Sequence, residues 1–288
     1  MTRFRACGKQ FSTGELQTIR SIIETPDRPN RAEISRRVCQ ALRWVRPDGQ
    51  LKDMSCRVAL LRMHRQDLIT LPPPKTRNGN GRCMRTTSSR SNPQNPITQK
   101  AGKLEQLCLQ LIEQKNQSSL WNEYIHRYHY LTYTPLPGAQ LRYFIQTKHQ
   151  ILGALGFGAA AWKTAPRDRW IGWDQTQRKN RLHLIVNNAR FLILPWVTSD
   201  NLASKVLAMA ARRITDDWLK RYGYQPVIME TFVEKQRFPG TSYKAANWIY
   251  LGDTKGRGKL DVHHKNPLPI KAIFVYPLIK NFREKLIH

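Results

Sequence analysis

Apolar residues recur at helical spacing through the first 73 residues of the chain. Ile34, Val38 and Leu42 fall on one face of a segment that Asn30 can cap, which predicts a helix over residues 31–44. Similar patterns predict the other elements of this region, which are helices over 14–24 (capped by Thr13) and 53–66 and a short strand over 69–71.

The third predicted helix has one apolar and one basic side. Its apolar side is formed by Cys56, Ala59, Leu60 and Met63, and its basic side by Lys52, Arg57, Arg62 and Arg65. Three helices followed by a strand resemble a helix-turn-helix module with a reduced wing, whose last helix enters the major groove. The alternative is a small helical bundle with solvated basic faces. We therefore predict a helical, winged-helix-like nucleic-acid-binding module over residues 1–73.

Residues 74–103 differ sharply in composition from what precedes them. They contain seven basic residues, no acidic ones and almost no large apolar side chains. Such a segment buries too little surface to offset its chain entropy, so we predict a basic, flexible linker. Arg77, Arg82 and Arg85 in this linker are candidates for contacts with phosphate.

From residue 104 to residue 288 the pattern is that of a mixed α/β domain. Strands are predicted over 141–147, 151–161, 182–196, 226–234, 250–254 and 272–276, and helices over 104–116, 120–127, 202–222 and 242–249. Because helices interrupt only some of the strand pairs, we expect a mostly antiparallel sheet and assign the chain to the α+β class.

The charge of the chain indicates its class of partner. Lysine and arginine total 48 against 20 acidic residues, a formal net charge of +28. Such self-repulsion is usually relieved by a polyanion, and DNA or RNA is the commonest one. No run of 18 apolar residues and no basic amphipathic helix favours a membrane. No apolar segment follows the basic start, so we expect no secretory signal and a cytoplasmic location.

The five cysteines do not form a recognisable framework. Cys7, Cys39, Cys56, Cys83 and Cys108 are odd in number, widely spaced and without a CxxC pair, so neither a zinc ribbon nor a set of disulfides is predicted. This usage is typical of a reducing compartment. Cys39 and Cys56 lie among periodic apolar residues and are expected to be small core residues.

Several long motifs carry a resemblance to a known family. They are YHYL at 128–131, PGAQLRY at 137–143, LGALGF at 152–157, RDRWIGW at 167–173, IVNNARFLI at 185–193, GTSYKAANW at 240–248 and GRG at 256–258. Together they resemble the family of the Druantia anti-phage system protein DruA, whose relatives also occur in mobile elements. The resemblance implies a role in phage defence or mobile-element biology, with other anti-phage system proteins as partners. It implies no established reaction.

The order of elements is also similar to the acetyltransferase (GNAT-like) fold. In that fold a strand, here 192–197, leads to a helix whose N-terminus holds the pyrophosphate of coenzyme A. The phosphate loop Arg-x-x-Gly-x-Gly/Ala would fall on Thr198, Asn201 and Ala203, which lack the arginine and the first glycine. The tyrosine that often protonates the leaving thiolate would fall on Trp248. The order of elements therefore supports the fold, whereas the motif does not support coenzyme A as a cofactor.

Glu230 is the candidate catalytic residue. It follows Val227-Ile228-Met229 at the end of a predicted buried strand, where desolvation would raise its pKa towards that of a general base. A structural hydrogen-bond anchor is the alternative. A Mg²⁺ site for phosphodiester hydrolysis would draw on Asp168, Asp174, Glu230, Asp261, His263 and His264. No spacing matches a nuclease signature, and Arg167-Asp168 indicates an ion pair, so we predict no metal site.

Polar residues inside a predicted strand are candidates for contacts with nucleic acid. Asn187, Asn188 and Arg190 interrupt an apolar run, where polar groups need partners. They could read base edges or clamp phosphates, or they could hold a β-bulge through side-chain hydrogen bonds.

Basic residues elsewhere in the second region are further candidates. Arg127 and Arg142 flank the aromatic segment 128–133, whose rings could stack bases or could form an aromatic core at a domain seam. Arg257 and Lys259 belong to a glycine-containing basic loop that could meet phosphate or be simply solvated.

Taken together, these patterns predict a nucleic-acid-binding protein, with DNA favoured, acting in anti-phage defence or mobile-element biology. One alternative is an enzyme that modifies or cleaves nucleic acid, either acyltransferase-like or a metal-dependent nuclease. The other is an assembly subunit of a multi-protein defence complex, whose positive surface binds acidic partner proteins.

Overall fold

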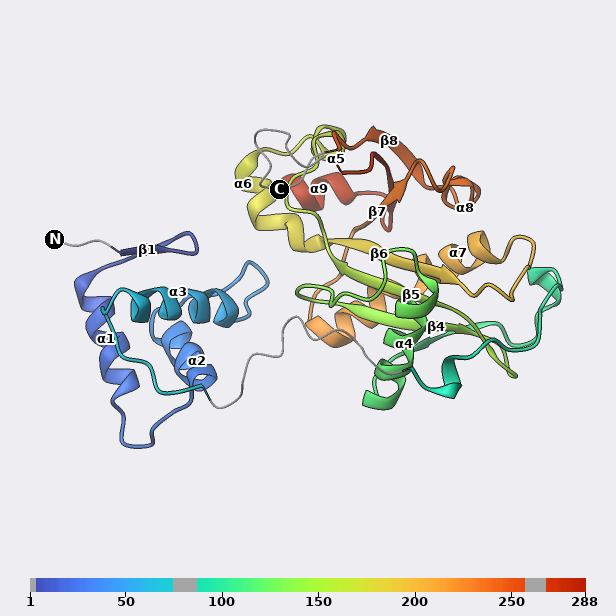
Figure 1. Cartoon of the computed structure of the whole chain (residues 1–288). Helices are drawn as coiled ribbons and strands as arrows, with labels where there is room; N and C mark the ends of the chain where they lie inside the picture. Colours follow the sequence, from blue (N-terminus) through green and yellow to red (C-terminus); the bar gives the residue numbers. More distant parts are fainter. Residues whose placement is uncertain (1–3, 75–86, 257–267) are drawn as a thin grey trace. The chain divides into compact units, whose positions relative to one another are not determined.

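The computed structural model describes residues 4–74, 87–256 and 268–288 (Figure 1). The chain forms two compact units, Met1–Arg82 and Cys83–His288. Residues 87–103, which the sequence assigns to a linker, belong to the second unit. There the amide N–H and hydroxyl of Ser88 donate to Glu123, and Ile97 forms a parallel bridge with Val197. These contacts order a segment whose composition alone predicts flexibility.

Unit 1 contains a β-hairpin and three helices. Its elements are β1 (Phe4–Ala6), β2 (Lys9–Phe11), α1 (Thr13–Ile23), α2 (Arg31–Ala41) and α3 (Asp53–Arg65). The three helices are where the sequence predicts them. Asn30 caps α2 as expected, whereas Ser12, not Thr13, caps α1 through a capping box with Glu15.

The predicted strand over 69–71 is not present, so the prediction of a reduced wing is wrong. Ile69 and Leu71 are buried in an irregular segment, and the guanidinium of Arg20 donates to the carbonyl of Leu68. The connection between α2 and α3, residues 42–52, is also longer than the three or four residues of a helix-turn-helix turn. Unit 1 therefore has the predicted helices without the predicted wing.

The core of unit 1 forms where the apolar faces of its helices meet the hairpin. Ile19, Ile34, Val38 and Met63 are fully buried in it. Cys39 and Cys56 are buried there as free thiols, which confirms the prediction that they are core residues.

Unit 2 is built around a seven-stranded sheet of order β3-β4-β5-β6-β7-β9-β8. Its strands are β3 (Cys108–Leu111), β4 (Leu141–Gln146), β5 (Ile151–Ala159), β6 (Ile185–Ile193), β7 (Ile228–Glu234), β8 (Ile249–Asp253) and β9 (Lys271–Pro277). Its α-helices are α4 (Lys115–Tyr128), α5 (Ala165–Ile171), α6 (Gln175–Arg181), α7 (Leu202–Tyr222), α8 (Thr241–Ala245) and α9 (Phe282–Ile287). Among the seven described strands of this sheet, only β6 and β7 pair in parallel, which confirms the predicted α+β class with a mostly antiparallel sheet.

Helices α4 and α7 cover opposite faces of the sheet. Successive residues of a strand point to opposite faces, and in β4 the hydroxyl of Tyr143 donates to Asp217 of α7 at 2.9 Å. Its neighbour Phe144 instead meets Tyr124 of α4 edge to face. Helix α7 also makes the crossover between the parallel strands β6 and β7, as the GNAT-like order of elements requires.

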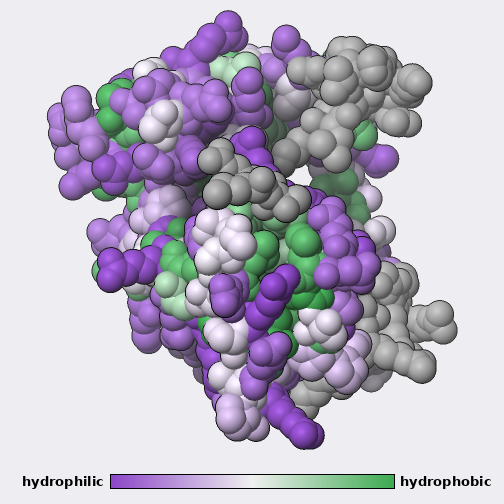
Figure 2. Space-filling model, turned by 90° about the vertical axis from the view of Figure 1, so that its left-hand side faces the viewer, coloured by the Kyte–Doolittle hydropathy of each residue, from purple (hydrophilic) through white to green (hydrophobic). Residues whose placement is uncertain are grey.

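The predicted helix over 104–116 is wrong, because its central part is strand β3. This strand adds to the edge of the sheet beside β4, with Leu109 opposite Ile145. Its apolar residues are too few and too closely spaced to distinguish a buried strand from a helix by periodicity. No helix within the described ranges is long and apolar enough to cross a membrane. On the face shown in Figure 2, hydrophilic residues predominate and apolar ones form smaller areas.

A buried ion pair connects α5 to the central strand β7. Arg167 and Glu230 have no exposed side-chain surface, and the guanidinium of Arg167 donates to the Glu230 carboxylate at 2.7 Å. Arg167 also donates to the carbonyl of Ala161 and to Asp168, while the second oxygen of Glu230 accepts from the amide of Ala161. Every charged atom of the pair thus has a hydrogen-bond partner, which is the condition under which a buried pair is tolerated.

Removing one member of this pair should destabilise unit 2 strongly. We expect Arg167→Met to lower the free energy of unfolding by about 3–5 kcal/mol, because Glu230 would be left buried and uncompensated. Asp253→Asn is the matched control, since it breaks the exposed Lys235–Asp253 pair and should cost at most about 1 kcal/mol. Urea unfolding followed by tryptophan fluorescence measures both, and equal small losses in the two variants would contradict the prediction.

Candidate functional site

The parallel strands β6 and β7 separate partway along their length. They pair only at Ile185–Ile228, Val186–Met229 and Asn187–Glu230, although β6 continues to Ile193 and β7 to Glu234. The register between β5 and β6 shifts at Ala189, which is an extra residue opposite Gly156 and Phe157. Such a bulge bends its strand. The bend in β6 accompanies an opening between the two strands.

Hydrogen bonds hold the point where the strands separate. The side-chain amide of Asn188 donates from its Nδ2 to the backbone carbonyls of Gly156 and Arg190. Its Oδ1 accepts from the hydroxyl of Tyr243 at 2.7 Å. The hydroxyl of Thr231 donates to the carbonyl of Asn188 at 3.1 Å. Asn188, Thr231 and Tyr243 are all buried, and burial raises the pKa of the Tyr243 phenol, so this hydroxyl stays protonated. This network connects β6, β7 and α8.

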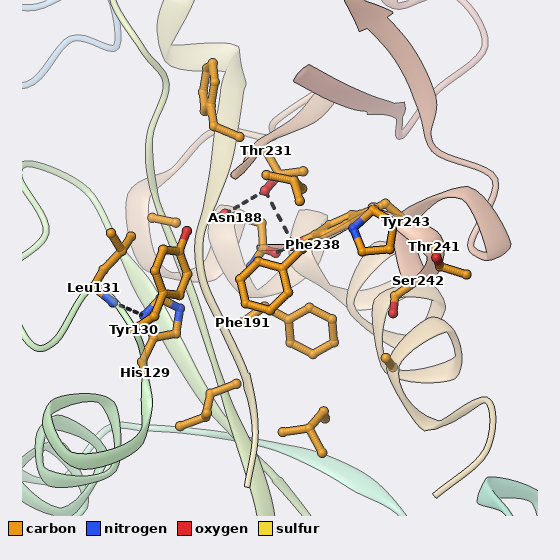
Figure 3. A pocket seen from close by; sticks show the side chains of 18 of the residues that line it. His129, Tyr130, Leu131, Asn188, Phe191, Thr231, Phe238, Thr241, Ser242 and Tyr243 are labelled. Atoms are coloured by element: carbon orange, nitrogen blue, oxygen red, sulfur yellow. Dashed lines mark hydrogen bonds between the residues drawn. The ribbon is translucent and has the colours of Figure 1, made fainter. Parts of the chain in front are cut away.

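The opening forms a cavity of about 470 Å³. Figure 3 shows His129 and Tyr130 on one side of it, Thr241, Ser242 and Tyr243 on the other, and Phe191 and Phe238 between them. Ala203, in the first turn of α7, also lines it. No lysine, arginine, aspartate or glutamate is among the described lining residues. The cavity therefore suits a ligand, or a part of one, that is uncharged and largely aromatic or apolar.

His129 is a neutral hydrogen-bond donor in this cavity. Burial and the nearby Arg190 guanidinium lower its pKa to about 4. Its Nδ1 accepts the amide N–H of Leu131 at 3.2 Å, which leaves the ring proton on Nε2. Within the described chain, Nε2 makes no hydrogen bond. It can thus donate to a carbonyl oxygen or a ring nitrogen of a ligand.

Two of the three predicted polar residues of β6, Asn188 and Arg190, have structural partners. Asn188 and Arg190 hold the bulge, because Arg190 donates to the carbonyl of Ala189 and to Thr134. This is the second of the two interpretations that the sequence left open. The side-chain oxygen of Asn187 is buried without a hydrogen-bond partner in the described residues.

The predicted basic residues beside the aromatic segment separate into two environments. Arg127 is exposed, lies over the ring of Tyr128 and donates to Ser91 and Asn92. Arg142 lies over the ring of Trp121 and donates to Asn122 and Ser118, and burial lowers its pKa. Of the two, Arg127 is the one that stacks on a lining residue of the cavity, Tyr128.

The candidate residues of unit 1 also differ in whether an ion pair within the chain already engages them. Arg57 pairs with Asp53 at 3.1 Å and donates to Ser35, whereas Arg62 and Arg65 are exposed. In the described residues, Lys52, Arg62 and Arg65 make no ion pair. Five predicted contact residues lie outside the described ranges, and these are Arg77, Arg82, Arg85, Arg257 and Lys259.

Glu230 is paired with Asn187 where β6 and β7 are still joined, and it is not one of the lining residues of the cavity. Burial raises the pKa of its carboxyl, while Arg167 and the Ala161 amide oppose that rise. Both oxygens are engaged, so the structure gives Glu230 the anchoring role; acting as a base would require the ion pair to open first. Asp168 binds Arg167 and Arg178, Asp174 caps α6, and Asp261, His263 and His264 are not described. No cluster of potential metal ligands occurs among the described residues.

The start of α7 does not fit the pyrophosphate of coenzyme A. The amide of Thr198 already donates to Ile97, that of Leu202 donates to Ser199, and the Ser199 hydroxyl donates to Gln99. The exposed Asp200 adds a negative charge where phosphate would bring more. The segment around residue 97 thus occupies one backbone amide just before α7, that of Thr198.

Sequence reasoning found the pieces of this cavity but not their assembly. The stretches 128–131 and 240–243 are recognisable motifs, yet they are more than 100 residues apart in the sequence, and only the opening between β6 and β7 brings them together. The signal that could have identified the opening was the polar pair Asn187-Asn188 inside an apolar strand.

The neutrality of His129 makes the stability of unit 2 depend on pH. The imidazole pKa is about 4 in the folded state against 6.5 when unperturbed, so below pH 6.5 the unfolded chain takes up a proton that the folded chain does not. The stability that the neutral imidazole contributes is complete above pH 6.5 and is lost as the pH falls. Between pH 7 and pH 5 the free energy of unfolding of the wild type therefore decreases. We expect this decrease to be smaller by about 2 kcal/mol in His129→Gln, which has no imidazole to protonate. Urea unfolding at both pH values tests this, and an unchanged pH dependence would argue against a buried neutral imidazole.

Two solved acetyltransferase structures are similar to this chain at low sequence identity. A Salmonella typhimurium acetyltransferase that modifies the N-terminal serine of ribosomal protein L7/L12 is 11% identical, over 49% of this chain and 64% of that one, with a TM-score of 0.31. SpeG, a spermidine/spermine N-acetyltransferase from Vibrio cholerae, is 11% identical over 62% and 96%, with a TM-score of 0.38. The chain spans less than two thirds of the Salmonella enzyme's length. At these TM-scores the likeness carries no conclusion about activity.

No curated protein matches this sequence. A model of the Druantia protein DruA family matches residues 62–268. That range includes the end of α3, the strands β6 and β7 and both segments that close the cavity. Because the match covers well over half of the sequence, as the motifs led us to expect, this chain belongs to the family of the Druantia protein DruA.

Proposed function

We propose that this chain binds duplex DNA through helix α3 of unit 1, and that it acts in anti-phage defence or mobile-element biology through that binding. The observation that carries the proposal is the exposed side of α3. Met54, Val58, Arg62 and Arg65 are all exposed. At 100° per residue they fall within about 80° of one another, opposite the buried residues of the helix.

The chemistry of this side suits the major groove. Met54 is 63% exposed and Val58 is 42% exposed, which is costly for apolar side chains unless a partner covers them. Apolar side chains on a helix in the groove contact thymine methyl groups, while arginines bind guanine edges or phosphates. The order along α3, apolar residues first and arginines last, provides both kinds of contact on one helix.

Most lysine and arginine side chains in the described ranges make no ion pair. Within the described ranges, ion pairs engage ten of the 40 lysine and arginine side chains. Cations that are both unpaired and exposed, such as Arg62 and Arg65, are therefore available to an external polyanion, and each phosphate contact would release condensed counterions.

Helix geometry favours DNA over RNA as the partner. The major groove of B-form DNA admits an α-helix, whereas the major groove of A-form RNA is deep and too narrow. A chain that reads nucleic acid with α3 would therefore bind duplex DNA more tightly than duplex RNA of the same sequence. Other anti-phage system proteins would meet the DNA-bound chain through surfaces other than this side of α3.

The double variant Arg62→Glu/Arg65→Glu tests the proposal. We expect duplex DNA affinity near 100 mM salt to fall more than tenfold and the slope of log affinity against log salt to fall by about 2, one unit for each phosphate that an arginine no longer binds. Fluorescence anisotropy with a labelled duplex over a salt series measures both quantities.

The matched control is Arg212→Glu/Lys220→Glu on the exposed side of α7, which changes the net charge by the same amount. A loss of affinity confined to the α3 variant supports the proposal. Equal losses in the two variants would indicate a general charge effect and reject α3 as the reading helix. Tighter binding of duplex RNA than of duplex DNA would also reject it.

A further inference from the structure

We propose that the cavity between β6 and β7 binds a single unstacked nucleotide, with its base enclosed in the cavity and its phosphate outside. This site belongs to unit 2 and uses none of the residues of α3. It extends the proposed function from duplex binding to the recognition of one base, and it can hold or fail independently of α3.

The walls of the cavity offer aromatic faces to a planar ligand. Tyr130, Phe191, Phe238 and Tyr243 line it, and Phe238 is 46% exposed although it contacts the ring of Tyr130. An exposed phenylalanine at the edge of an aromatic cavity gains most from a partner that stacks on it. Bases stack on aromatic side chains irrespective of their sequence. A cavity of about 470 Å³ is within the usual range for a ligand of nucleoside size.

The polar groups that remain free in the cavity are those that a base requires. His129 offers its Nε2–H, and the hydroxyls of Thr241 and Ser242 have no hydrogen-bond partner in the described part of the chain (Figure 3). All three are uncharged. A hydroxyl both donates and accepts, and a neutral imidazole donates from one nitrogen, so together they match the mixed donors and acceptors of a base edge.

Charge is placed at the rim of the cavity and not inside it. Arg127 lies over the ring of Tyr128 at 5.2 Å and Arg237 over the ring of Tyr130 at 5.4 Å, and both tyrosines line the cavity. Arg237 pairs with Glu234 and keeps 57% of its side chain exposed. An uncharged interior with guanidinium groups at its edge matches a nucleotide, whose base is neutral and whose phosphate is anionic.

An acyl-pantetheine chain is the main rival occupant of an opening between two strands in this fold. It fits less well, because the loop before α7 lacks the arginine and the first glycine of the phosphate-binding motif and the lining is rich in aromatic rings. Nucleotides that leave a duplex or a single strand are read in enclosed sites of this kind, by stacking and by hydrogen bonds to the base edge.

The test uses the full chain and two probes. One probe is each of the four deoxynucleoside 5′-monophosphates, followed by calorimetry; the other is a single-stranded oligonucleotide with one 2-aminopurine, whose fluorescence reports the environment of the base. We expect saturable binding of at least one monophosphate. Phe238→Ala should weaken it by about 5- to 100-fold, the usual effect of losing one stacking partner.

His129→Phe keeps an aromatic ring and removes the donor, so it should weaken binding and change the preference among the four bases. Trp162→Ala is the matched control, since Trp162 is 47% exposed and is not a lining residue of the cavity. It should leave monophosphate binding unchanged. Circular dichroism shows whether each variant is folded.

Each result separates the two proposals. Monophosphate binding that is lost in Phe238→Ala and retained in Arg62→Glu/Arg65→Glu supports the nucleotide site, whether or not α3 binds duplex DNA. Absence of monophosphate and 2-aminopurine binding in the wild-type chain overturns it. Binding that is unaffected by Phe238→Ala and His129→Phe also overturns it.

Discussion

The divergence of two parallel strands is the constraint on which the rest of unit 2 depends. Parallel strands need a crossover, and the 21 residues of α7 supply it between β6 and β7. Because the crossover begins soon after β6 ends, the start of α7 lies beside the opening, and Ala203 becomes part of its wall. The strands pair at only three positions before they separate. Their separated edges persist because Asn188, Thr231 and Tyr243 hydrogen-bond across the gap.

Unit 2 also contains buried arginines. Because of them, part of the net positive charge of the chain is not on its surface. Arg167 is wholly enclosed, and Arg190 is 8% exposed. Each donates to backbone carbonyls as well as to side chains, so these cations secure loops and a bulge instead of facing solvent. The guanidinium suits this use because its donors are rigidly arranged and stay protonated. A charge count therefore overestimates the surface available to phosphate, and the exposed cations must be identified one by one.

The sequence predicted the elements with long, regular patterns and missed those that depend on distant partners. Helix α7 and strands β6 and β7 were predicted because each carries a long apolar pattern. Strand β3 was not, since four residues carry no period and its strand character comes from pairing with β4. For the site, the polar residues of β6 were singled out, but the partner of Glu230 is 63 residues away in the sequence. No local pattern predicts which arginine will reach a given carboxylate.

The two units would gain binding free energy from nucleic acid in different ways. Contacts between arginines of α3 and phosphates release counterions, so their contribution falls steeply with salt. A base enclosed among Phe191, Phe238 and Tyr243 gains mainly from stacking and from removal of apolar surface from water, and salt affects these little. The base must first leave its stack, which costs a few kcal/mol and costs least in single-stranded or mismatched DNA. A chain with both sites would therefore bind any duplex through charge, and would bind more tightly where a base is already unpaired.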